Sequence, residues 1–184
     1  MGARPYYFDA DAVEDVESLI RERDIFMKSV IAELIGKYAD QPGNLIAAVE
    51  GLKDSELDKR LGEGKWSIRQ QVNHLADSEM NMVQRMKKII AEDTPLLPAY
   101  DQDRWADSLF YSKSSVDDSV ALFFMLRTSM TRVLKKMGDK DFDRCGIHTE
   151  TGKVTLLSLL EDTVEHADHH VKMIGKIKSK FKIK

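Results

Sequence analysis

The sequence predicts an all-α protein built as a bundle of four long helices. Four long stretches repeat apolar side chains every three or four positions, which is the period of a helix with one buried face. Short segments rich in glycine, proline and polar residues separate these stretches. Apolar residues make up 42% and charged residues 32% of 184 residues, a composition that fits a sizeable core. No linker, repeat or low-complexity tract divides the chain, so we expect a single domain over residues 1–184.

The N-terminal part predicts one long helix over about residues 11–39, within an N-terminal helical segment of residues 1–41. The sequence Gln41-Pro42-Gly43 should end this helix, because proline lacks the backbone N–H that a helix interior needs. A shorter helix over residues 44–50 and a brief turn at residues 54–57 should follow. Two glycines, in Gly62-Glu63-Gly64, then break the chain before the second long helix.

The second long helix should begin after Ser67, a residue type that caps helices, and should run to about residue 92. Two prolines in residues 93–100 predict a loop or extended connection. The third helix should cover about residues 116–137 and stop at Gly138. An irregular connection or small hairpin over residues 141–153 leads to the last helix, about residues 155–178. The remaining residues, 179–184, form a basic tail that we expect to fray.

Four of the five histidines lie on two of the predicted helices, and three of these four share the last one. His166 and His170 are four residues apart, so they point the same way and can share a metal ion. On a helical wheel His170 falls within the apolar arc and His166 at its margin, whereas His169 points outside. Because a core-facing imidazole needs a partner, we expect His166 and His170 to be ligands and His169 to be free.

His74 is the third candidate ligand, on the second long helix. It lies beside the apolar arc and shares a polar strip with Ser78, Asn81 and Arg85. One interpretation is an ordinary solvated face. The other is a groove wall that leads from a metal ion to Arg85, whose guanidinium offers a bidentate site for an anionic group. Asp77, one turn beyond His74, is either a solvated carboxylate or a group that orients a ligand or acts as a base.

Charge and cysteine content exclude several classes of function. The formal net charge is −3, which gives no reason to expect nucleic acid as a partner. The single cysteine, Cys145, rules out an internal disulfide framework and is typical of a reducing cytoplasm; we interpret it as a small hydrophobic residue. No stretch is long and apolar enough for a membrane span, and the acidic N-terminus does not resemble a signal peptide. The sequence therefore predicts a cytoplasmic protein without a membrane partner.

Several residue patterns resemble the DinB/YfiT superfamily, in particular its YfiT-like branch, over about residues 42–178. The matching residues run in a fixed order and spacing. They are Trp66-Ser67-Ile68-Arg69-Gln70, His74-Leu75-Ala76-Asp77-Ser78, Asn81, Arg85, Glu92-Asp93-Thr94-Pro95, Pro98, Tyr100-Asp101, Trp105-Ala106, His148, Gly152, Thr155-Leu156, His166 and His169-His170.

This resemblance implies a DinB/YfiT-like four-helix bundle of up-down-down-up topology, here with an additional N-terminal helical extension. It also implies a homodimer and a divalent metal ion held by three histidines, which by position are His74, His166 and His170. We expect zinc or nickel, with iron as an alternative. The family is described as metal-dependent hydrolases, and some relatives are S-transferases that use low-molecular-weight thiols such as bacillithiol.

The predicted function is a metal-dependent enzyme that acts on a small molecule, as a hydrolase or as an S-transferase that takes a low-molecular-weight thiol. Asp77, Asn81 and Arg85 are its candidate residues for supporting the ligands or lining a substrate groove. The alternative is a non-catalytic dimeric bundle stabilised by metal, with a structural or stress-response role. A third interpretation treats the histidines as a pH-responsive face without metal.

Three positions depart from the YfiT-like pattern. Relatives often have histidines where this chain has Asn73 and Glu79, and proline where it has Thr149. None of the three is a proposed ligand, so the metal site is expected to persist while its surroundings differ.

Overall fold

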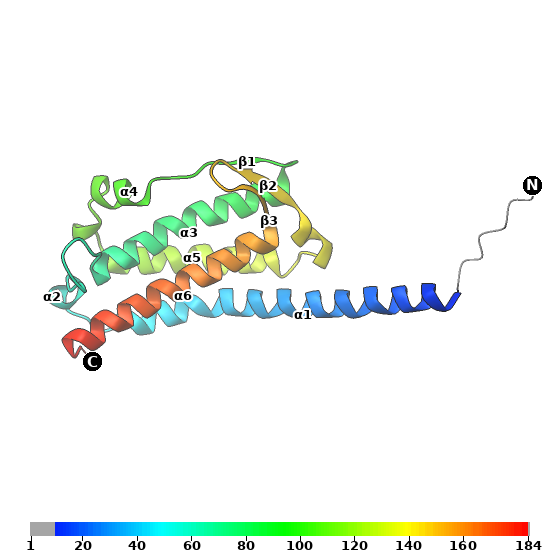
Figure 1. Cartoon of the computed structure of the whole chain (residues 1–184). Helices are drawn as coiled ribbons and strands as arrows, with labels where there is room; N and C mark the ends of the chain where they lie inside the picture. The colour runs from blue at the N-terminus through cyan, green and yellow to red at the C-terminus, as the bar shows by residue number, and fades with distance from the viewer. Residues whose placement is uncertain (1–9, 184) are drawn as a thin grey trace, which may run out of the picture.

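The computed structural model describes residues 10–183 and confirms the predicted four-helix bundle. The four long helices are α1 (Ala10–Val49), α3 (Ile68–Ala91), α5 (Val116–Leu134) and α6 (Leu156–Phe181). In Figure 1, α1 and α6 run in one direction and α3 and α5 in the other, which is the expected up-down-down-up topology. Helix α1 packs against α5 and α6, and α3 packs against the same two helices, so the core lies between all four.

Local sequence explains where three of the helices begin. Ser67 caps α3 by accepting a hydrogen bond from the backbone N–H of Gln70, whose side chain bonds back to the N–H of Ser67. The side chains of Ser115 and Thr155 cap α5 and α6 in the same way, each accepting from the N–H three residues on. The predicted Ser67 cap is confirmed. Helix α5 ends at Leu134, slightly before the expected end.

The prediction that the first helix ends at residues 41–43 is wrong, because α1 continues through Pro42 to Val49 and includes the segment predicted as a separate helix. Pro42 has no N–H to give to the carbonyl of Tyr38. Nη1 of Arg127, on α5, donates a hydrogen bond of 3.4 Å to that carbonyl instead. The missing backbone bond is thus replaced from a neighbouring helix, and α1 does not have to stop.

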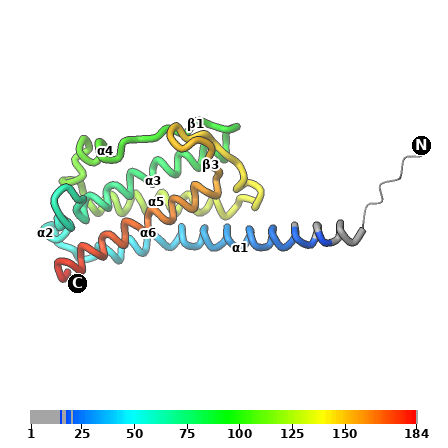
Figure 2. The backbone as a smooth tube through the Cα atoms, viewed as in Figure 1, coloured from blue at the N-terminus to red at the C-terminus, as the bar shows by residue number. Residues whose placement is uncertain are grey.

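The helices are joined by short elements at the two ends of the bundle. Helix α2 (Asp54–Leu57) precedes α3, and strand β1 (Leu96–Leu97) with α4 (Gln102–Ser108) and the 3-10 helix η1 (Tyr111–Lys113) form the long crossover from α3 to α5. Figure 2 follows this crossover back along the outside of α3. Helix α4 was not predicted, since seven residues are too few to show a helical period.

A small sheet closes the opposite end, after the 3-10 helix η2 (Asp139–Asp143). Strands β2 (Cys145–His148) and β3 (Gly152–Thr155) pair antiparallel, which confirms the hairpin alternative, and β1 adds to β2 in parallel. Gly146 allows this close pairing, because a Cβ atom there would lie 2.9 Å from the carbonyl oxygen of Pro95. None of the helices in the described part of the chain is apolar enough over sufficient length to cross a bilayer.

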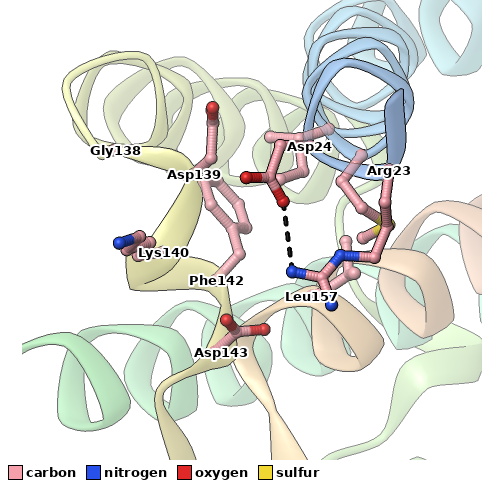
Figure 3. A pocket seen from close by; sticks show the side chains of 10 residues that line it. Arg23, Asp24, Gly138, Asp139, Lys140, Phe142, Asp143 and Leu157 are labelled. Atoms are coloured by element: carbon pink, nitrogen blue, oxygen red, sulfur yellow. Dashed lines mark hydrogen bonds and ion pairs between the residues drawn. The ribbon is translucent and has the colours of Figure 1, made fainter. Parts of the chain in front are cut away.

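The N-terminal part of α1 extends beyond the bundle (Figure 1), so α1 is both a bundle helix and the predicted extension. Its side chains join the core from Ile31 onward. A hollow of about 830 Å³ lies where α1 leaves the bundle, between α1 and η2. Figure 3 shows the ion pair of Arg23 with Asp24 on one side of this hollow and Asp139 with Phe142 of η2 on the other.

Candidate metal centre

The structure brings together the three histidines that the sequence selected. His74 comes from α3, and His166 and His170 from successive turns of α6. Nε2 of His166 lies 3.0 Å from Nε2 of His74 and 3.1 Å from Nε2 of His170. One ligand nitrogen from each residue lies within 4.8 Å of the other two, and His169 is exposed to solvent. We call His74, His166 and His170 the histidine triad.

All three imidazoles are neutral at neutral pH, so that their lone pairs are available. Burial lowers the pKa of His74 to about 3, that of His166 to about 4 and that of His170 to about 2. Repulsion between positive charges lowers these pKa values further, because protonation of one histidine disfavours protonation of the next, and for His166 the charge of the nearby Arg127 acts first. Neutral imidazole is the form that binds metal ions.

Gln71 determines which nitrogen of His170 carries the proton. Nδ1 of His170 donates a hydrogen bond to Oε1 of the buried Gln71, so Nε2 of His170 is left with a lone pair that faces the triad. Nε2 of His166, which has one lone pair or one proton, then lies within hydrogen-bond distance of both other Nε2 atoms. A cation among the three nitrogens would instead accept all three lone pairs, and nitrogens bound about 2.0–2.1 Å from a tetrahedral ion lie about 3.3–3.4 Å apart. The residues present therefore fit a divalent metal ion.

A hydrogen-bond network centred on Arg127 holds α6 in place beside the triad. Arg127 is 1% exposed and donates to the carboxylate of Glu79 at 2.7 Å, to the amide oxygen of Gln41 and to the carbonyl of Thr163. Thr163 lies one turn before His166. The amide of Gln41 also donates to the carbonyl of Val164 and to the carboxylate of Asp168, so α6 is bound on both sides of His166.

The three departures from the YfiT-like pattern all have structural partners. Glu79 pairs with Arg127 and accepts a hydrogen bond from the hydroxyl of Tyr38. Asn73 accepts one from the hydroxyl of Ser119, and Thr149 accepts one from the backbone N–H of Ala99. At all three positions the chain uses the side chain to join two elements of the fold.

The polar strip on α3 leads away from the triad under the crossover. Asp77 accepts a hydrogen bond of 2.5 Å from the hydroxyl of Tyr111, and the amide of Asn81 donates to the backbone carbonyl of Asp77. Arg85 lies eleven residues from His74, about 16 Å along the helix. Its guanidinium donates to the carbonyl of Pro98 at 2.6 Å and to the sulfur of Met82. The structure thus places Asp77 and Asn81 next to each other, whereas Arg85 binds the crossover.

Two residues near the triad were not selected from the sequence as site residues. Gln71 bonds to His170, and the ring centroid of Trp66 lies 4.7 Å from that of His74. Gln71 lies on the same helix as His74, but only the packing of α3 on α6 shows that it meets His170. Trp66 lies before the helix begins, so no helical period could place it.

Replacing Gln71 by leucine should weaken metal binding about 10–100-fold, the usual cost of losing the outer partner of a metal-binding histidine. The Gln71→Glu variant should retain affinity, because a carboxylate also accepts the Nδ1–H of His170. Competition with a chromogenic chelator measures the metal affinities of both variants. Equal affinity of Gln71→Leu and wild type would show that this hydrogen bond does not orient His170.

Comparisons with known proteins give related sequences and a related fold. A family model described as the DinB superfamily matches residues 37–174. The Bacillus subtilis protein named "Putative metal-dependent hydrolase YfiT" is 34% identical over 158 residues, which cover 85% of this chain and 89% of that protein. An Oceanobacillus iheyensis protein, "Putative metal-dependent hydrolase OB0413", is 31% identical and covers 77% of this chain and 81% of its own length.

A solved structure has the same fold. YfiT from Bacillus subtilis, described with its structure as a probable metal-dependent hydrolase with an unusual four-helix bundle topology, superposes with a TM-score of 0.80 at 32% identity. The match covers 84% of this chain and 89% of that one.

Proposed function

The chain belongs to the DinB superfamily, and from this premise we propose that it is a metal-dependent enzyme that acts on a small organic molecule. His74, His166 and His170 hold one divalent ion, with zinc or nickel expected before iron. The observation that carries the proposal is the convergence of three neutral Nε2 atoms, two pairs of which lie 3.0 and 3.1 Å apart. Three histidine ligands are typical of catalytic sites, which leave a coordination position open, whereas structural sites are closed by four ligands.

An ion bound by three neutral ligands supplies Lewis acidity: it can activate water or a thiol as a nucleophile and polarise a carbonyl. Water as nucleophile gives hydrolysis, and a low-molecular-weight thiol gives S-transfer. The chain's own residues hold the ligand side chains in position. Gln71 fixes the lone pair of His170, and the Arg127 network fixes the turn of α6 that carries His166.

Asp77 is a candidate group for orienting the substrate or taking up a proton in this reaction. It lies one turn from His74 on α3 and is half-buried. The hydroxyl of Tyr111 holds one of its carboxylate oxygens, which fixes the direction of the other. Its role rests on this geometry and on the proposed function.

The proposed function is tested with protein purified without a histidine tag and analysed by elemental mass spectrometry. Protein reconstituted with Zn²⁺, Ni²⁺ or Fe²⁺ is then assayed against ester and amide panels and against pairs of thiol and electrophile. We expect one metal ion per chain and turnover that a chelator abolishes. Stoichiometric metal without turnover in either panel supports the alternative, a bundle that metal only stabilises. Protein that takes up none of these ions contradicts the proposal.

The homodimer implied by the family resemblance remains a prediction, which the exposed surface of α1 supports. Outside the bundle α1 exposes Leu19, Ile25 and Phe26, each at least 65% accessible, beside the hollow at η2. Because these exposed apolar side chains lie next to the hollow, two copies related by a twofold axis can each place them in the hollow of the other copy.

Light scattering should therefore give twice the chain mass of 21.0 kDa for the wild type. It should give the single-chain mass for the double variant Ile25→Lys, Phe26→Lys. Phe110→Lys serves as the control, because Phe110 is equally exposed but lies beside α4. A double variant that remains dimeric would place the interface elsewhere.

A further inference from the structure

Trp66 is the aromatic residue that packs against two rings of the histidine triad. Its ring centroid lies 4.7 Å from that of His74 and 6.3 Å from that of His170, and its plane is inclined by only 20° to the ring of His170. Among the described residues no other aromatic ring apart from the histidines themselves contacts the triad. The indole is half-buried, so it packs against the imidazoles with part of its surface and presents the rest to solvent.

The backbone around Trp66 is fixed, which makes the indole a defined wall. Ser67, the next residue, is the N-cap of α3, and it forms an isolated β-bridge with Arg60. The N–H of Ile68 donates to the carbonyl of Lys59. Gly64, with φ of 70°, provides the left-handed turn that brings the chain back to this bridge. The backbone position of Trp66 is therefore fixed by the turn before it and by the hydrogen-bonded residues after it.

Part of this indole is open to solvent. A large aromatic ring left partly open to solvent beside a metal-binding site offers flat apolar area at low cost in side-chain entropy. Its Nε1–H makes no hydrogen bond to another described residue, so it is available to an acceptor on a ligand. Small-molecule sites combine such apolar walls with a few polar groups.

We propose that Trp66 forms one wall of the substrate position and that the preferred substrates carry a flat apolar group next to the atom that meets the metal. This inference rests on the proposed function, since it assigns the substrate class of the same site. Stacking on the indole selects among molecules that share the same metal-binding group. Trp66 is thus a specificity-determining residue.

The test uses two probes that bind a metal through the same hydroxamate group, acetohydroxamate and benzohydroxamate. Acetohydroxamate carries a methyl group where benzohydroxamate carries a phenyl group. The ratio of their dissociation constants therefore reports the contact of the phenyl group with the indole of Trp66. With Zn²⁺-loaded full-length protein we expect benzohydroxamate to bind about three- to tenfold more tightly, the range that corresponds to an aromatic pair. Titration calorimetry measures the two constants.

The chain offers a matched control, because it has only two tryptophans. Trp105 on α4 is also half-buried, but its ring lies against that of Tyr100 in a tilted arrangement, at 4.7 Å between centroids. The preference for benzohydroxamate should disappear in Trp66→Leu, which keeps apolar contact with His74 but has no flat face. It should persist in Trp105→Phe and be partly kept in Trp66→Phe. In Trp105→Phe, where Trp66 is the sole indole, benzohydroxamate should also change the tryptophan fluorescence.

The outcomes separate this inference from the proposed function. The role of Trp66 is overturned if metal-loaded wild-type protein binds both hydroxamates equally, or if the preference for benzohydroxamate survives in Trp66→Leu. Neither result contradicts the proposal that the protein is a metal-dependent enzyme. Protein that takes up no metal overturns both. Metal content of every variant is measured before titration, so a variant that fails to load is recognised, and Trp66→Phe then provides the comparison.

Discussion

Replacing His170 by alanine should abolish stoichiometric metal binding and every metal-dependent activity of this protein. The variant removes one of three ligand nitrogens, and it leaves the amide oxygen of Gln71 without the Nδ1–H that it accepts. Loss of an outer partner alone costs about 10–100-fold in affinity, so loss of a ligand should exceed about 100-fold. Elemental mass spectrometry after gel filtration measures the bound metal.

The neighbouring histidine gives the matched control for this experiment. His169 lies on the same helix, is exposed and contributes no atom to the triad. His169→Ala should therefore retain metal. Thermal unfolding is a second readout, because an ion that binds only the folded state stabilises it by about 2.7 kcal/mol at a hundredfold excess over the dissociation constant. Added Zn²⁺ should raise Tm for wild type and His169→Ala only. Full metal content in His170→Ala would contradict the assignment of the ligands.

Replacing Arg127 by methionine should lower the free energy of unfolding by about 3–5 kcal/mol, the usual cost of removing one partner from a buried ion pair. The guanidinium is almost completely buried and lies 4.0 Å from the ring centre of Tyr38. Its loss leaves the carboxylate of Glu79 without a cationic partner and the carbonyl of Tyr38 without its donor. Chemical unfolding in the presence of a chelator measures the change.

Two further variants identify the cause. Arg132→Met changes an exposed arginine on the same helix and should stay within about 0.5 kcal/mol of wild type. The double variant Arg127→Met, Glu79→Leu should recover part of the loss, because it leaves no unpaired buried charge. If Arg127→Met is as stable as Arg132→Met, the network does not hold α6 to its neighbours.

The effect of Arg127→Met should depend on pH through Glu79. Burial raises the pKa of Glu79, and Arg127 and the hydroxyl of Tyr38 lower it again in part. Without Arg127 the pKa in the folded state rises further above its unfolded value, so the folded state binds more protons in the window between the two. Stability is then lost as pH rises through the folded pKa. The difference between variant and wild type should be larger at about pH 8 than at about pH 5.5. A constant difference would show that Glu79 does not titrate in this window.

The sequence was sufficient for the bundle and for two of the three histidines because both depend on local spacing. The 3.6-residue period marked the four long helices, and the i, i+4 spacing put His166 and His170 on one face of α6. The orientation of His170 toward the core and the exposure of His169 followed from the same wheel. The third histidine of the triad, His74, was the remaining candidate on a second helix and was assigned by the family resemblance, while its position beside the apolar arc only allowed this role.

Pro42 shows why a local rule failed. Proline predicts a helix end because it removes a donor, and that rule holds as long as no other group replaces the donor. Here Arg127, 89 positions beyond Tyr38 in the chain, gives a hydrogen bond to the carbonyl of Tyr38. No property of residues 38–45 indicates this, because the compensating group comes from another helix.

Helical period and residue spacing thus determined by themselves that this protein is a helical bundle and that His166 and His170 share a face. Only the tertiary structure decided that α1 passes through Pro42, that Gln71 orients His170, that Arg85 binds the crossover and that Trp66 packs against His74 and His170. The physical reason is the distance over which each interaction acts. Periodicity reports which face of a helix is buried, whereas a hydrogen bond or ring contact between helices depends on how those faces are packed together.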